Sequence, residues 1–149
     1  MRAFSFVAAA FGAAFMAGCG ETAGPVLPPE LTEMPGLLID GPPPLESLVA
    51  PDIVSQSLPF LVTATSFGSS SCTEPAGYSS ITSQDRVEIS LRDRVALEAS
   101  GCTRDLRGFP RTLIVAFDQA GTAEVVVIGR DEQGEPLEVR RTVTVLQAP

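Results

Sequence analysis

The sequence predicts an all-β protein whose strands pack as a two-layered antiparallel sandwich. From Leu48 to the end, short runs alternate apolar with polar residues and are rich in Val, Ile, Thr and Phe, which is the pattern of half-buried strands. Gly, Ser, Pro and Asp separate these runs and favour turns. No part of this region carries an apolar stripe of helical period over three turns, so we expect no helix there.

We expect about seven strands between Leu48 and the C-terminus. The runs that predict them lie at residues 48–55, 60–65, 87–91, 95–99, 113–117, 123–128 and 139–146. Seven short strands in about 100 residues suit a sandwich, because two sheets of this size enclose one core about 10 Å thick.

Residues 117–127 indicate which kind of β-sandwich to expect. Residues 117–127 read Phe-Asp-Gln-Ala-Gly-Thr-Ala-Glu-Val-Val-Val, and this order of apolar residue, Gly-containing turn and Val-rich strand resembles a strand corner of bacterial immunoglobulin-like domains. The resemblance covers residues 113–145 and implies an immunoglobulin-like sandwich without shared catalytic residues. The chain has no Trp between its cysteines, unlike antibody domains, so it resembles the architecture and not that family.

The last expected strand places a charge on its apolar face. Arg141 has the same parity as Val139, Val143 and Val145. Either a β-bulge at Arg140 and Arg141 resets the register, or an inward charge protects an edge strand from pairing with another chain. We expect the bulge.

The first residues of the chain follow a different pattern. Arg2 gives a positive start, residues 3–17 form an apolar stretch of about 15 residues, and Met16-Ala17-Gly18-Cys19 closes it. This arrangement resembles the export signal and lipobox of bacterial lipoproteins. The resemblance implies removal of residues 1–18, acylation of Cys19 by palmitate-type chains, and a place in the cell envelope. Gly20, in place of Asp, resembles the pattern for sorting to the outer membrane.

This segment has two other interpretations. A transmembrane helix needs roughly 20 apolar residues, so the run is too short for one. A secretory signal cut elsewhere, for instance after Ala10, would leave Cys19 as a thiol. A lipid anchor at Cys19 would need no contact between the protein surface and the membrane, because two acyl chains bind a membrane durably, whereas one binds it only marginally.

Residues 19–47 are expected to form a linker between the lipid and a domain at 48–149. From Gly20 to Ser47 there are seven prolines, five acids and no basic or aromatic residue, a composition that favours disorder. As extended polyproline II these residues would reach roughly 90 Å. A Pro-rich docking motif, or a short turn or strand near residues 37–39, is the alternative.

Charge excludes several classes of partner. After removal of residues 1–18, nine Arg stand against eighteen acids, which leaves a net charge of −9. Such a surface repels anionic phosphates. We therefore expect neither nucleic-acid binding nor electrostatic docking on a membrane.

The two remaining cysteines, Cys72 and Cys102, are expected to form a disulfide in an oxidising compartment. Both lie in Ser- and Gly-containing sequence, so the bond would join two loops at one end of the domain. A metal-binding or redox pair is the alternative. The absence of His and of Cys-x-x-Cys spacing speaks against it.

Two charged loops were considered as binding sites. Arg104, Arg107 and Arg111 follow Cys102 and would suit a carboxylate-bearing partner, although a solvated loop with local ion pairs is the simpler interpretation. Residues 131–135, Asp-Glu-Gln-Gly-Glu, would suit calcium, but their spacing is not that of an EF-hand loop. We expect a charged hairpin turn there, with no metal and no cofactor.

The residue types that remain argue against catalysis. The chain has no His and no Lys, which removes the commonest general base, Ser-His and Cys-His nucleophile systems, Schiff bases and Walker-type loops. One Tyr and no Trp leave little for a sugar-binding cleft. An enzyme is therefore not expected.

These observations predict a lipid-anchored cell-envelope protein with a non-catalytic binding or structural domain. Its partner would be an envelope protein. The alternative is an assembly or carrier accessory that holds a protein or a small apolar ligand between its sheets. A cavity for such a ligand would exceed about 300 Å³ and would be lined by Phe60, Phe67, Phe109 or Phe117.

Overall fold

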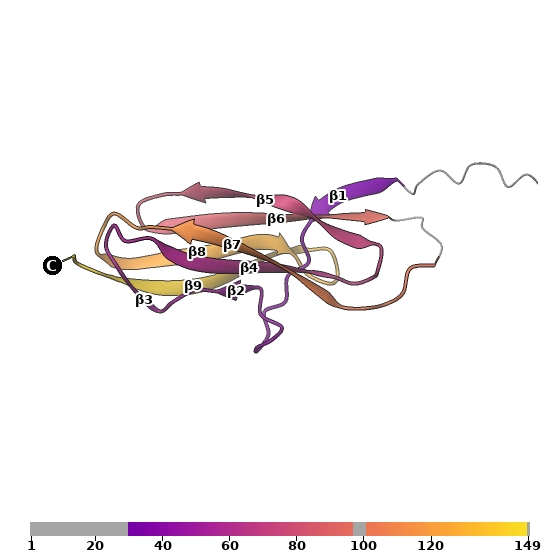
Figure 1. Ribbon diagram of the computed structural model, residues 1–149, viewed down its shortest axis with the longest axis horizontal. Coiled ribbons are helices and arrows are strands. Elements are labelled where there is room, and N and C mark those ends of the chain that lie inside the picture. The colour runs from indigo at the N-terminus through magenta and orange to yellow at the C-terminus, as the bar shows by residue number, and fades with distance from the viewer. Residues whose placement is uncertain (1–29, 97–100, 149) are drawn as a thin grey trace, which may run out of the picture.

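The computed structural model describes residues 30–96 and 101–148, and these residues form an all-β sandwich (Figure 1). The predicted signal, Cys19 and residues 20–29 lie outside the described residues. The strands of the described part are β1 (Leu31–Pro35), β2 (Leu48–Val49), β3 (Ile53–Ser55), β4 (Phe60–Gly68), β5 (Thr73–Thr82), β6 (Arg86–Ala96), β7 (Arg107–Val115), β8 (Gly121–Arg130) and β9 (Pro136–Leu146). The predicted all-β, immunoglobulin-like fold class is confirmed.

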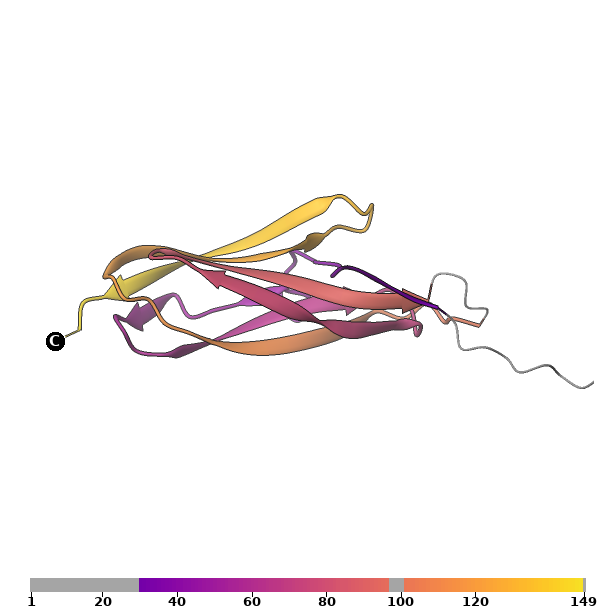
Figure 2. The same ribbon diagram turned by 90° about the horizontal axis from the view of Figure 1, so that it is seen from above.

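The strands form two layers of unequal width, seen edge-on in Figure 2. The larger sheet has the order β5-β6-β8-β9-β3, and β1 joins it by pairing with β6. The smaller sheet has the order β2-β4-β7. One edge of β6 is shared, because β8 pairs with residues 86–90 of β6 and β1 pairs with residues 92–96.

The core lies between the sheets and follows the predicted alternation. On β6, Val87, Ile89 and Leu91 are buried while the residues between them are not, as the two-residue period of a strand requires. Val125 and Val127 of β8 are buried as well, but so is Val126 between them. Phe60 and Phe117 meet at one end of the core with ring centroids 5.7 Å apart.

Several strands differ from their predicted limits. The run at 87–91 and the start of the run at 95–99 form one strand, β6, which is described up to Ala96; residues 97–99 lie outside the described residues. The run at 48–55 is split into β2 and β3, because Pro51 lies between them and lacks the N–H that a continuous ladder needs. The strand β5 was not predicted, because its Ser, Thr and Gly residues are mostly exposed and show no apolar alternation.

The larger sheet is mixed, whereas we expected antiparallel pairing throughout. The strands β6 and β8 run parallel, as do β3 and β9. The tight hairpin between β5 and β6, closed by the bond from Ser83 N–H to Arg86 O, puts β5 at the edge and turns β6 to the direction of β8.

The predicted boundary at Leu48 is wrong, because residues 31–47 belong to the sandwich. Leu37 and Leu38 are buried. Leu37 bridges the sheets, since its carbonyl accepts from Phe67 N–H of β4 and the next N–H, that of Leu38, donates to Arg130 O of β8. Composition predicted a linker because the segment is rich in prolines and acids, yet the two buried leucines, their backbone hydrogen bonds and the pairing of β1 with β6 hold it on the core.

Two glycines allow the chain to enter between β6 and β8. Gly36 donates to Leu91 O and accepts from Arg130 N–H, both at 2.9 Å. A Cβ on Gly129 would lie 2.3 Å from Gly36 O, far inside van der Waals contact. Only glycine at 129 permits this approach of two backbones.

The expected bulge at Arg140 and Arg141 is also wrong. The pairing of β8 with β9 runs without a register shift, with Val125 opposite Arg141 and Val127 opposite Val139. Arg141 therefore points inward, half-buried, and its Nη2 lies 3.9 Å from Glu46 Oε2. The outer edge of β9 pairs with β3 only over residues 144–146, so Arg141 lies where that edge is open, as the alternative interpretation required.

Candidate functional site

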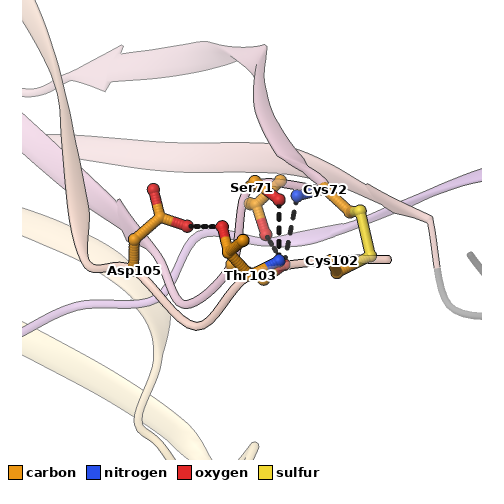
Figure 3. Close-up of a disulfide and its surroundings, with 7 residues drawn as sticks. Ser71, Cys72, Cys102, Thr103 and Asp105 are labelled. Carbon is orange, nitrogen blue, oxygen red and sulfur yellow. Dashed lines mark hydrogen bonds between the residues drawn. A yellow bond between two sulfur atoms is a disulfide. The ribbon is translucent and has the colours of Figure 1, made fainter. Parts of the chain in front are cut away.

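The disulfide between Cys72 and Cys102 ties the loop before β5 to the segment before β7, as predicted (Figure 3). Its Cα atoms are 5.5 Å apart. Ser71 and Thr103 brace the same crossing, because Ser71 N–H donates to Thr103 O at 3.0 Å and Thr103 N–H donates to Ser71 Oγ at 2.9 Å. This end of the sandwich is therefore held by a covalent bond and paired backbone groups.

Asp105 organises the arginine loop that follows the disulfide. It accepts a hydrogen bond of 2.9 Å from Thr103 Oγ1 and pairs with Arg107. The Thr103 hydroxyl, followed by the Arg107 guanidinium, holds the pKa of Asp105 below its usual value of 3.8. Arg107 is thus already occupied, while Arg104 is exposed to solvent.

Arg111 does not belong to that loop. It lies in the middle of β7 and its side chain points into the sandwich, where it is only 10 % exposed. The three arginines therefore do not form one carboxylate-binding cluster: Arg104 and Arg107 lie at the surface, and Arg111 is structural.

Arg111 forms a buried polar bridge between the sheets. Its Nη2 lies 3.0 Å from Asp93 Oδ1 of β6, and its Nη1 donates to Ser66 Oγ of β4 at 2.8 Å. Ser66 Oγ in turn donates to Asp93 Oδ1 at 2.7 Å. Asp93 Oδ2, in contrast, has no hydrogen-bond partner within the described part of the chain.

Sequence reasoning missed Asp93 and Ser66 as members of this network. A signal was present, since Asp93 continues the inward parity of Val87, Ile89 and Leu91. An acid on the apolar face of a strand needs a partner there. Nothing in the sequence identifies that partner as Arg111, which is distant along the chain and meets it only across the sandwich.

The surface of the described residues includes a polar hollow and a more apolar one. The polar one, of about 400 Å³, lies at the end opposite the disulfide, lined by Thr82, Ser83, Gln84, Ala116, Asp118 and Gln119. The more apolar one, of about 280 Å³, lies where β1 and β8 meet on β6, with Arg92 and Arg130 among its walls. Neither is lined by the four phenylalanines expected around an intersheet ligand; Phe67 and Phe117 are buried in the packed interior.

The acidic turn at 131–135 is a hairpin turn, as expected. Asp131 Oδ1 accepts from the N–H groups of Gln133 and Glu135, so this oxygen closes the turn. Residues 30–96 and 101–148 contain no group of three or more His, Cys, Asp or Glu side chains arranged to hold a metal ion.

In the part of the chain that the structure describes, no helix is long and apolar enough to cross a membrane. Comparison with protein-family models, curated proteins and solved structures finds no match to this chain.

Proposed function

We propose that this protein is a lipid-anchored component of the bacterial cell envelope whose sandwich acts as a non-catalytic binding or structural module. The observation that carries the proposal is the tetrapeptide Met16-Ala17-Gly18-Cys19, which resembles a lipobox, after an apolar stretch. The fold adds the position at which a chain tethered there would enter the domain. Leu31, the first residue of β1, pairs with Ala96, and Ala96 N–H donates to Cys72 O. The N-terminal side of the domain is therefore the disulfide-bonded end.

An anchor at Cys19 would hold this end toward the membrane. Eleven peptide steps separate Cys19 from Glu30, and each spans at most about 3.6 Å, so the domain stays within roughly 40 Å of the lipid. This length of roughly 40 Å is less than half of the roughly 90 Å expected for a linker that ended at Ser47. The lipoprotein is a short-tethered module, held at its covalently stapled end.

The opposite end is then the part displayed away from the membrane. It carries the polar hollow, lined by residues 82–84, Ala116, Asp118 and Gln119. Polar side chains and backbone groups of turns are the usual contacts of a binding loop. An envelope protein that binds there would contact the polar side chains of this hollow, Asp118 among them.

The anchor is tested by Cys19→Ser, with Gly18→Ala as the matched control because it keeps a small residue before the cysteine. Mass spectrometry of the N-terminal peptide is expected to show two or three acyl chains on Cys19 in wild type and control. Cys19→Ser should leave the signal uncleaved and the acyl mass absent. Membrane attachment of Cys19→Ser at the wild-type mass would refute the lipoprotein proposal.

Partner binding is tested by crosslinking in intact envelopes, comparing wild type with Cys19→Ser and with a variant of the distal end, Asp118→Arg. Loss of the same crosslinked partner in both variants supports display of the distal end. A partner retained by Asp118→Arg but lost by Arg104→Glu would place binding at the membrane-facing end instead.

A further inference from the structure

The two outer faces of the sandwich differ in charge. On the larger sheet, Arg86 and Arg140 form ion pairs with the surrounding acids Glu88, Glu124 and Glu138. These side chains cover Val126, which points outward from β8 and yet is fully buried. The charged side chains on that face are therefore exposed to water.

Among the described residues, no ionisable side chain points outward from the smaller sheet. The outward residues of β2, β4 and β7 that define this uncharged face are Val49, Leu61, Thr63, Thr65, Pro110, Thr112 and Ile114. Leu61 and Ile114 lie directly opposite each other and are 61 % and 76 % exposed. Figure 2 shows the smaller sheet on one side of the molecule, with no other described strand beyond it.

We propose that the uncharged face is the surface through which two copies of this protein associate. The chain carries a net charge of −8, so copies repel each other wherever acids face acids, over a Debye length of about 8 Å at physiological salt. A second copy brings the same uncharged face, and a two-fold axis sets Leu61 and Ile114 of each against the other. Like-on-like contact there involves no charge that must lose its hydration.

The area of the face sets the strength of this association. The outward residues span five paired positions of β4 and β7, with Val49 of β2 beside them, and give a footprint of about 17 by 12 Å, or roughly 400 Å² over both copies. Stable interfaces bury about 1,200 to 2,000 Å². The dimer is therefore weak in dilute solution and forms when the proposed anchor, on which this step rests, concentrates the copies on a membrane.

Two edges of the sandwich, those of β7 and β5, do not offer an equivalent route. Thr65 N–H donates toward Ser47 O, away from β7, so Pro110 opposite it turns its nitrogen to the open edge of β7. A proline there removes a donor that an added strand would need. The strand β5 carries a register irregularity between Pro75 and Gly77, which likewise disfavours edge pairing.

The test compares full-length wild type with Ile114→Lys and with the matched control Ile81→Lys. Ile81 is 70 % exposed and lies in β5, an edge strand of the larger sheet. Sedimentation equilibrium up to about millimolar concentration measures dimers in solution. Energy transfer between labelled copies in phosphatidylcholine vesicles measures them on a membrane. We expect dimers of wild type and Ile81→Lys, and association weakened about tenfold or more in Ile114→Lys, because a charge is placed in the contact.

The outcomes separate this proposal from the anchoring proposal. Monomers of wild type throughout the concentration range, or equal loss in both lysine variants, would overturn the dimer face. Binding of Cys19→Ser to neutral vesicles that is weakened by adding Ile114→Lys, and not by adding Ile81→Lys, would identify lipid as the occupant and overturn the proposal as well. A wild type without acyl chains would contradict the anchor alone, since sedimentation still measures association.

Discussion

Arg111 Nη2 and Asp93 Oδ1 lie 3.0 Å apart and join the two sheets of the sandwich through a buried ion pair. Ser66 completes the contact from β4. A pair of this kind holds the sheets in one register, because neither charge tolerates burial without the other.

Breaking this pair from one side is expected to destabilise the domain strongly. Asp93→Leu leaves a buried guanidinium, and Arg111→Met leaves a buried carboxylate, and each should lower the free energy of unfolding by about 3–5 kcal/mol. The double variant Asp93→Leu, Arg111→Met should recover most of this loss, because it removes both charges. Urea unfolding of the four proteins measures the coupling, and simple additivity of the single changes would contradict it.

The position of the domain boundary is tested by two leucines on either side of the Pro-rich cluster. Leu38→Ala should lower the free energy of unfolding by about 2–5 kcal/mol, because the side chain is 2 % exposed in the core and its removal leaves a cavity. Leu45→Ala, at an exposed position, should change it by about 0.5 kcal/mol or less. Equal, small effects in thermal or urea unfolding would restore the linker interpretation.

The disulfide is expected to contribute through the unfolded chain. It closes a loop with a sequence separation of 30, for which chain entropy gives about 3–4 kcal/mol. The double variant Cys72→Ser, Cys102→Ser should lose this amount in urea unfolding. Reducing agent should shift wild type by a similar amount and leave the variant unchanged. A variant as stable as oxidised wild type would show that the bracing bonds of Ser71 and Thr103 are sufficient.

The carboxyl of Asp105 should titrate below its usual value of 3.8, because Thr103 and Arg107 stabilise its ionised form. A depressed pKa gives a contribution to stability that is present above the unfolded value and is lost as pH falls through the folded value. Since the group is exposed, this contribution is small. Thr103→Val should raise the pKa in a carbon-13 NMR titration, whereas Thr122→Val in β8 should leave it unchanged. An unchanged midpoint in Thr103→Val would assign the shift to Arg107 alone.

Local patterns predicted the strands whose faces divide clearly into buried and exposed residues. Val87, Ile89 and Leu91 of β6 were recognisable because alternation and burial coincide there. The strand β8 was recognisable from its run of Val and Ile, although Val126 is buried together with Val125 and Val127. The strand β5 was not, since it lies at a sheet edge and buries little of its surface. An edge strand needs only a hydrogen-bonding neighbour, and composition carries no trace of that.

The candidate site was predictable where it depends on chemistry and not where it depends on pairing across the sandwich. Cys72 and Cys102 could be paired because no third cysteine competes once Cys19 is assigned to lipid. The separation of Arg111 from Arg104 and Arg107 could not be foreseen, because it follows from β7 starting at Arg107 and from the inward parity of Arg111. Long-range contacts between sheets decide such cases.

The entry of the chain along β6 also decides how the protein would respond to mechanical tension. A pull on the residues before Leu31 acts first on the five-residue ladder of β1 and β6, and only after that on Leu37 and Leu38 between the sheets. The strand β5 pairs with the other edge of β6 and begins next to Cys72. The Cys72–Cys102 disulfide therefore lies close to the β1–β6 ladder that carries the load. Tension applied from a membrane would thus act on the disulfide-bonded end of the sandwich, and the opposite end would keep its shape.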